Sequence, residues 1–367
     1  PAPPAKTGYD YMNANQPTEA QVMWDRRRSS HPKILVDDVL GLAPRTKEDG
    51  EKIKYVRDLG LPKGIGDQLI ASTRDFAMRY WIIDNSGSMK AQSGHRVVRG
   101  AGGREGMVAC SRWEELGEGI KWHAAMAAHL HAPTEFRLLN APSGFAGKTV
   151  ACGYGDGDSE VELVDRMIQS EPDGATPLCQ AIRQVTAEIR SREASLRGAG
   201  KRAVVVIASD GAASDGDVHA ALRPLKSLPA WVVVRLCTDD DAVVQYWNGV
   251  DKGMDMDVLD DLAGEAAEVT EANPFLTYAA PMHRLREWGT SVKLFDLLDE
   301  RKLAIAELLQ LAQLIFGDAA DDLPRPELDY EAFARALDDV QKSVGLVWDP
   351  LRNRNRPYFD LKKLHKS

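Results

Sequence analysis

WIIDNSGSMK, residues 81–90, is the stretch of the sequence that decides the fold. The apolar run that begins at Arg79 stops on the carboxylate of Asp84, and two hydroxyls follow at alternate positions, Ser86 and Ser88. A continuous apolar run is typical of a strand that is buried on both faces of a parallel sheet. In open α/β sheets ligands bind at the carboxyl ends of the strands. The stretch therefore predicts a central strand over 79–83 that ends in a binding site.

Further strands alternate with helices along the chain. Apolar runs predict strands at 135–140 (EFRLLN), 202–209 (RAVVVIAS) and 231–237 (WVVVRLC), and a short one at 148–151 (KTVA). Ser111 and Glu114 form an S-x-x-E capping box, which marks the start of a helix. Such alternation predicts an α/β fold with a doubly wound, mostly parallel sheet covered by helices on both faces.

Composition changes divide the chain into three predicted parts. Residues 1–74 begin with a Pro- and Ala-rich segment and are expected to form an N-terminal arm and a short helical region. The alternating pattern occupies 75–270. From 271 to 367 only amphipathic helical patterns follow, and we expect a helical C-terminal extension packed on the sheet domain.

Charge and cysteine usage exclude some classes of function. With 367 residues and a net charge of -9, the chain lacks the basic footprint of a general binder of nucleic acid or anionic membranes. Its apolar runs are too short to span a bilayer, and no secretory signal is recognisable. The four cysteines, which have no metal-ligand spacing, are expected to be small buried side chains. We expect an intracellular, cytoplasmic protein without membrane insertion.

Three loops carry oxygen ligands to the predicted edge of the sheet. Asp84, Ser86 and Ser88 follow the first strand, Thr176 lies at the start of a helix in DGATPL, and Asp210 ends the strand 202–209. Two carboxylates and three hydroxyls suit Mg²⁺, or else Mn²⁺ or Ca²⁺, rather than zinc. Neutral hydroxyls leave the ion under-neutralised, so we expect it to attract a carboxylate from outside the chain.

These elements resemble the metal-ion-dependent adhesion site of von Willebrand factor type A domains. DNSGSM supplies the D-x-S-x-S element through Asp84, Ser86 and Ser88, GATPL supplies the lone threonine Thr176, and SDG supplies Asp210. The resemblance covers about 78–270 and looks closest to the intracellular, stand-alone branch of the family. It implies a doubly wound sheet with one antiparallel edge strand, for which 148–151 is the candidate. It also implies an ion that bridges to an acidic residue of a partner.

A basic insert separates Ser88 from the first helix. Residues 89–110 carry Arg96, Arg99 and Arg104, whereas members of the family often enter that helix directly. One hypothesis is a basic rim that recognises an acidic or phosphorylated partner. The alternative is a surface hairpin without a binding role, which is common for an inserted polar loop.

The residues favour a binding module over an enzyme. We expect a divalent-metal-dependent protein interaction module that binds an Asp or Glu of a partner, and we expect no enzymatic activity and no binding of nucleic acid. One alternative is an accessory subunit of an ATPase assembly; the sequence has no Walker motif, so the ATPase would be a separate chain. The other alternative, a metal-dependent hydrolase, lacks an evident positioned base or nucleophile.

Overall fold

The computed structural model describes residues 47–99, 105–155, 157–238, 240–251 and 256–365. A six-stranded sheet with the order β5-β4-β1-β6-β7-β8 forms its centre. The strands are β1 (Phe76–Ile83), β4 (Thr134–Leu138), β5 (Thr149–Cys152), β6 (Arg202–Ser209), β7 (Ala230–Leu236) and β8 (Met256–Leu259). All neighbours pair in parallel except β4 and β5. The predicted doubly wound sheet with one antiparallel edge strand is confirmed.

Both faces of the sheet are buried, which explains the continuous apolar runs. Side chains alternate between the faces along a strand. Trp81 and Ile83 of β1 belong to one hydrophobic cluster, whereas Tyr80 and Ile82 belong to a second cluster on the opposite face. These four side chains are fully buried. A strand in this position needs apolar residues at every step, and β1 has them.

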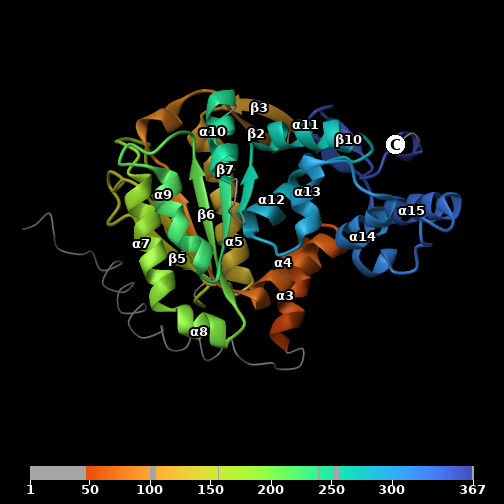
Figure 1. Cartoon of the computed structure of the whole chain (residues 1–367), viewed down its shortest axis with the longest axis horizontal. Coiled ribbons are helices and arrows are strands. Elements are labelled where there is room, and N and C mark those ends of the chain that lie inside the picture. The colour runs from red at the N-terminus through yellow and green to blue at the C-terminus, as the bar shows by residue number, and fades with distance from the viewer. Residues whose placement is uncertain (1–46, 100–104, 156, 239, 252–255, 366–367) are drawn as a thin grey trace, which may run out of the picture.

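Helices cover both faces (Figure 1). The second cluster lies beneath α7 (Leu178–Ser191), α9 (Val218–Leu222) and α10 (Asp241–Asp251). The first cluster lies beneath α4 (Lys63–Asp75), α5 (Arg112–His129), α6 (Gly157–Ile168) and α12 (Ala280–Trp288). Helix α5 begins at the predicted capping box, in which the Ser111 hydroxyl accepts from the Glu114 amide and the Glu114 carboxylate accepts from the Ser111 amide.

The insert that follows Ser88 forms a hairpin at the carboxyl end of the sheet. A short 3₁₀ turn, η1 (Gly87–Lys90), leads into β2 (Gly94–Arg99), which pairs antiparallel with β3 (Glu105–Cys110). The hairpin lies near the carboxyl ends of the strands in Figure 1. The backbone amide of His95 donates to the carboxylate of Glu115 on α5 at 2.9 Å, so the hairpin is tied to that helix.

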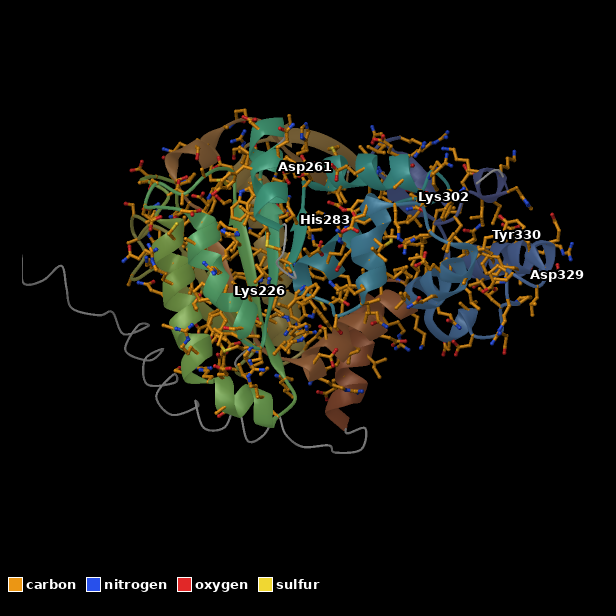
Figure 2. All side chains as sticks on the ribbon, in the orientation of Figure 1. Lys226, Asp261, His283, Lys302, Asp329 and Tyr330 are labelled. Atoms are coloured by element: carbon orange, nitrogen blue, oxygen red, sulfur yellow. The ribbon has the colours of Figure 1, made fainter. Side chains whose placement is uncertain are left out.

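The C-terminal helices share the first hydrophobic cluster with the sheet. Asp329 and Tyr330, at the start of α15, lie at the end of the molecule away from α7 (Figures 1 and 2). The remaining elements are α3 (Lys47–Asp58), α8 (Glu193–Gly198), η2 (Arg223–Ser227), α11 (Leu262–Ala272), α13 (Lys293–Glu300), α14 (Ile305–Phe316), η3 (Gly317–Ala320), α15 (Tyr330–Val344), β9 (Val347–Asp349), β10 (Arg354–Arg356) and α16 (Leu361–Leu364).

Arg79 joins the sheet to the helices on either side of it in the sequence. Its Nε donates to the carbonyl of Trp288 on α12 at 3.0 Å, and its Nη2 donates to the hydroxyl of Ser72 on α4 at 2.8 Å. The guanidinium carbon lies 3.9 Å from the centre of the Trp288 ring. Burial lowers the pKa of Arg79 to about 9. Segments from before and after the central strands are therefore held on one face of the sheet.

A buried ion network also fixes α12 on the sheet. The carboxylate of Glu287 accepts from Arg235 of β7 and from the imidazole of His123 on α5, both at 3.0 Å. His283, labelled in Figure 2, lies one helical turn before Glu287, with 3.4 Å between its Nε2 and the carboxylate. Burial acts to raise the pKa of Glu287, but Arg284 and the two histidines hold it well below its usual range.

One strand of the central sheet was not predicted, the C-terminal part contains the antiparallel pair β9–β10 where only helices were expected, and some boundaries differ. Strand β8 was not predicted, because its four residues include Asp257 and give only a weak apolar signal. Strand β1 begins at Phe76, three residues before the predicted start. The N-terminal arm at 1–20 lies outside the described residues, and the predicted domain boundaries stay predictions. In the described part of the chain, no helix is both long and apolar enough to cross a membrane.

Candidate metal centre

Asp84 and Asp210 lie side by side at the carboxyl ends of adjacent strands. Strands β1 and β6 are parallel neighbours with Ile83 opposite Ala208, and the Asp84 amide donates to the Ala208 carbonyl at 2.8 Å. The chain directly after each strand carries its carboxylate to the same edge. Asp84 is fully buried and Asp210 is 6% exposed. The sheet thus brings together two carboxylates that are 126 positions apart in the sequence (210 − 84).

The carboxylate of Asp84 is held by two hydrogen bonds. Its Oδ1 accepts from the Ser86 amide at 2.9 Å, and its Oδ2 accepts from the Ser209 hydroxyl at 2.7 Å. Burial raises the pKa of Asp84, while these hydrogen bonds oppose the rise. Asp210 adds a further, smaller upward contribution through charge repulsion. An added cation would relieve this repulsion.

The two serines connect the loop after β1 to Asp210. The hydroxyls of Ser86 and Ser88 are 3.0 Å apart, and the Ser88 hydroxyl donates to Asp210 Oδ1 at 2.9 Å. Ser86 has an extended backbone and precedes η1, so the chain turns directly after it. The two hydroxyls thus form a continuous series of hydrogen bonds from Ser86 through Ser88 to Asp210.

The loop that carries Thr176 is hydrogen-bonded to the loop that follows β1. The Gly87 amide donates to the Gly174 carbonyl at 3.1 Å, and the Asp173 amide donates to the Asn85 carbonyl at 2.8 Å. Gly174 has a φ of +95°, and a Cβ there would lie 2.9 Å from the Asn140 side chain, so glycine permits this close approach. Thr176 itself is partly buried, and its hydroxyl has no protein partner among the described residues.

One cation is paired with Asp210. The Nη1 of Arg112, the first residue of α5, lies 2.9 Å from Asp210 Oδ2. In the described part of the chain no other Lys, Arg or His nitrogen lies within 4.0 Å of Asp84 or Asp210. Arg112 was not among the predicted site residues. The sequence did contain a signal for this pairing. A positive charge is unfavourable at the N-terminus of a helix, where it opposes the helix dipole, so an arginine at that position suggests an acidic partner elsewhere.

The arranged side chains fit an oxygen-binding ion. Four of the five predicted ligands, Asp84, Ser86, Ser88 and Asp210, form one hydrogen-bonded group, and the loop of the fifth is bonded to their loop. Carboxylates and hydroxyls are the donors that Mg²⁺ and Mn²⁺ prefer. No cysteine or histidine belongs to this hydrogen-bonded group. The donor set is therefore that of a hard divalent cation.

The predicted basic rim is only partly described. Arg96 lies on β2 with its Nη1 3.8 Å from the carboxylate of Glu118 on α5, so it is engaged with the helix. The side chain of Arg99, and the whole of Arg104, lie outside the described residues. The hypothesis that these three arginines bind a partner stays a prediction.

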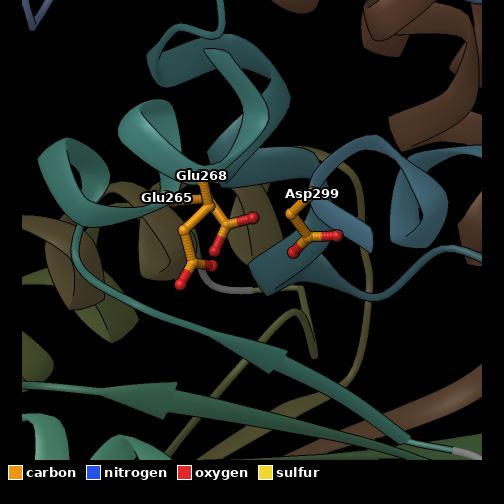
Figure 3. A group of neighbouring side chains, drawn as sticks. All are labelled: Glu265, Glu268 and Asp299. Atoms are coloured by element: carbon orange, nitrogen blue, oxygen red, sulfur yellow. The ribbon is translucent and has the colours of Figure 1, made fainter. Parts of the chain in front are cut away.

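A second carboxylate cluster lies far from this site in the sequence and was not predicted. Figure 3 shows the side chains of Glu265, Glu268 and Asp299 as neighbours. One carboxylate oxygen of each lies within 4.8 Å of those of the other two. Burial is the largest cause that raises the pKa of Glu265 well above its ordinary value and that of Glu268 to about 7. The like-charged pair at i and i+3 on α11 was the available sequence signal, since such a pair is unfavourable on an isolated helix.

Arg286 neutralises part of this second cluster. Its guanidinium pairs with Glu265, with Asp257 at 2.9 Å and with Asp299 at 3.2 Å. These contacts join α11, α12, α13 and β8. Nearby Asp296 has its pKa raised to about 8, chiefly by burial. The contacts identify the cluster as an internal network built around Arg286, in which carboxyl groups outnumber the guanidinium.

Comparisons with known proteins identify no family for the chain. No protein-family model matches the sequence, and no curated protein matches it. The function is therefore inferred from the site itself.

Proposed function

We propose that this protein binds Mg²⁺ or Mn²⁺ and uses the ion to bind an acidic residue of a partner protein. Asp84, Ser86, Ser88, Thr176 and Asp210 would hold the ion. The observation that carries the proposal is the hydrogen-bonded group formed by Asp84, the two serines and Asp210 at the carboxyl edge of β1 and β6.

The charge of the site supports an ion that keeps affinity for an outside anion. Two carboxylates do not exceed the charge of a divalent cation, the hydroxyls add no charge, and Arg112 already pairs with Asp210, so positive charge would be left over to attract an outside anion. Mg²⁺ also commonly retains exchangeable waters. A partner Asp or Glu can replace such a water. Ser88 is exposed and Thr176 is only partly buried, so the side chain of a partner could reach an ion held at this edge of the sheet.

The contacts of the site favour binding over catalysis. In the described residues, the groups bonded to Asp84 and Asp210 are hydroxyls, backbone amides or carbonyls and the Arg112 guanidinium. None of these is a general base at neutral pH. Hydrolysis normally also uses a positioned base or nucleophile beside the metal-bound water.

Metal binding is the first test. Isothermal titration with Mg²⁺ and Mn²⁺ should show one site in the wild type and none in Asp84→Asn. Asp318→Asn removes an exposed carboxylate from η3 and serves as the matched control, which should bind like the wild type. Equal binding by wild type and Asp84→Asn would refute the assignment of the site.

Partner binding is the second test. Affinity capture in Mg²⁺ or in chelator should yield a protein that requires both the metal and Asp84, and alanine substitution of one acidic residue of that partner should abolish the complex. Equal capture of the partner with and without metal, and by wild type and the Asp84 variant, would refute the bridging mechanism. Turnover of a phosphoester panel, lost in Asp84→Asn, would replace the binding proposal with an enzymatic one.

A further inference from the structure

Arg112 connects the candidate metal centre to the β2–β3 hairpin. Its Nη1 pairs with Asp210 Oδ2, while its Nε donates to the hydroxyl of Ser93 at 2.8 Å, and its backbone amide donates to the Ala91 carbonyl at 3.0 Å. Ala91 and Ser93 lie in the short link between η1 and β2. One side chain therefore bonds both a proposed metal ligand and the base of the hairpin.

The packing at this point leaves little freedom. Gly94, the first residue of β2, approaches the start of α5 so closely that a Cβ there would lie 2.6 Å from the Ser111 carbonyl oxygen. Asp210 is buried, and the side chain of Arg112 is 17% exposed. The guanidinium is thus partly shielded from water, where its charge acts more strongly on its neighbours than it would at the surface.

The charges of Arg112 and of a divalent ion act on the same carboxylate. Asp210 Oδ1 already accepts from Ser88, and Oδ2 is occupied by the guanidinium. An ion held between Asp84 and Asp210 would bring two positive charges close to Arg112. The ion and the guanidinium therefore repel each other and compete for one acceptor.

We propose that Arg112 is a tethered counter-cation that competes with the divalent ion for Asp210 and thereby couples metal binding to the hairpin. The inference rests on the proposed metal site. Without metal, Arg112 holds Asp210 and Ser93 together. When the ion binds, the guanidinium moves away from Asp210, and the hydrogen bonds of Arg112 to the base of the hairpin weaken. Because such coupling is reciprocal, a partner that displaces the hairpin raises the metal affinity.

Titration calorimetry with Mn²⁺ alone tests the competition. Arg112→Gln removes the charge and should tighten Mn²⁺ binding by about tenfold or more, since it removes a cation that is partly buried beside the site. Arg112→Lys keeps the charge and should stay within about threefold of the wild type. Ser93→Ala releases Nε and should give an intermediate affinity. Arg197→Gln removes an exposed charge from α8 and controls for net charge.

The outcomes separate this inference from the metal site itself. Binding of Mn²⁺ with equal affinity in wild type and Arg112→Gln would overturn the competition while leaving the site intact. Absence of Mn²⁺ binding in every variant would overturn the site and the competition together. Arg112→Lys and Ser93→Ala preserve most of the local contacts, so the comparison holds even if Arg112→Gln folds poorly.

Hydrogen exchange of the hairpin tests the coupling. Saturating Mg²⁺ should increase amide exchange in 94–98 and 105–110 of the wild type by severalfold. In Arg112→Gln the same amides should exchange fast with or without Mg²⁺. Hairpin exchange that does not respond to Mg²⁺ in the wild type, under conditions where Mg²⁺ is bound, would refute the coupling.

Discussion

Two substitutions of Asp84 separate its role in metal binding from its role in the fold. Asparagine keeps an acceptor that can take the place of Oδ1, so the hydrogen bond from the Ser86 amide survives. The new amide group would face Ser209, whose hydroxyl can accept as well as donate. Alanine removes both acceptors. The Ser209 hydroxyl retains the Gly211 carbonyl at 3.4 Å, but the buried Ser86 amide loses its partner.

The expected effects of the two substitutions on stability differ. An unsatisfied buried amide costs about 1–3 kcal/mol, so Asp84→Ala should lower the free energy of unfolding by about that amount. Asp84→Asn removes a carboxylate whose ionised form is disfavoured by burial and by Asp210. Without metal it should therefore be at least as stable as the wild type.

The pH dependence of this difference has a fixed direction. Because burial raises the pKa of Asp84 in the folded state, the folded protein holds this proton more tightly than the unfolded chain does. Wild-type stability is therefore lost as the pH rises from the ordinary carboxyl pKa through the folded-state pKa. Asparagine has no such proton. The advantage of Asp84→Asn should be greatest above the folded-state pKa and vanish at acid pH.

Urea denaturation in chelator and in Mg²⁺ measures the stability of each variant, its dependence on pH and the stabilisation by the metal. A ligand at one hundred times its Kd stabilises the folded state by about 2.7 kcal/mol, and the wild type should gain that amount in Mg²⁺. Neither Asp84 variant should gain stability. If Asp84→Asn were less stable than the wild type in chelator, the reasoning from burial would be wrong. If it kept the gain in Mg²⁺, Asp84 would not be a metal ligand.

Three further predictions concern the ion networks and the packing. Glu287→Gln should destabilise the fold by about 3–5 kcal/mol in urea denaturation, because the buried guanidinium of Arg235 loses one of its two carboxylate partners. Asp296→Asn should stabilise the protein by at least about 1 kcal/mol at pH 8 and have little effect near pH 4. The reason is that burial raises the pKa of Asp296 to about 8, so wild-type stability is lost as the pH rises from the ordinary carboxyl pKa to about 8, whereas asparagine carries no such proton. An equal effect at both pH values would contradict this. Gly289→Ala should cost about 1–3 kcal/mol, because Gly289 has a φ of +86° and a Cβ there would lie 2.8 Å from Val204; an unchanged urea midpoint would contradict the strain.

The parts of the fold that the sequence predicted are those with a strong local signal. Strand β6 matches the predicted 202–209 because seven of its eight residues are buried, and burial on both faces requires an uninterrupted apolar run. The short strand β5 was predicted from its own residues, but its antiparallel place at the edge of the sheet came from the family resemblance. Strand β8 escaped because a four-residue edge strand that includes an aspartate looks like a loop.

The residues of the candidate site also divide into those that a local sequence pattern predicts and those that depend on tertiary packing. Asp84, Ser86 and Ser88 form a short motif directly after a strand, so their proximity follows from local geometry. Their approach to Asp210 requires that β1 and β6 be neighbours, which no local pattern specifies; the resemblance supplied only Asp210 as a member of the ligand set. The pairing of Arg112 with Asp210 depends on how the hairpin positions the start of α5. No pattern within the sequence specifies that position.

The carboxyl edge of the sheet is connected to the C-terminal helices through a short series of buried charges. The carboxylate of Glu115 on α5 accepts from the amide of His95 in the hairpin, and it also pairs with Arg235 on β7. Arg235 in turn pairs with Glu287 on α12. Because each of these charged partners is largely buried, displacing one leaves the next without its counter-charge. A hairpin that moves when metal binds would therefore alter the support of α12, so the helical extension is physically linked to the site.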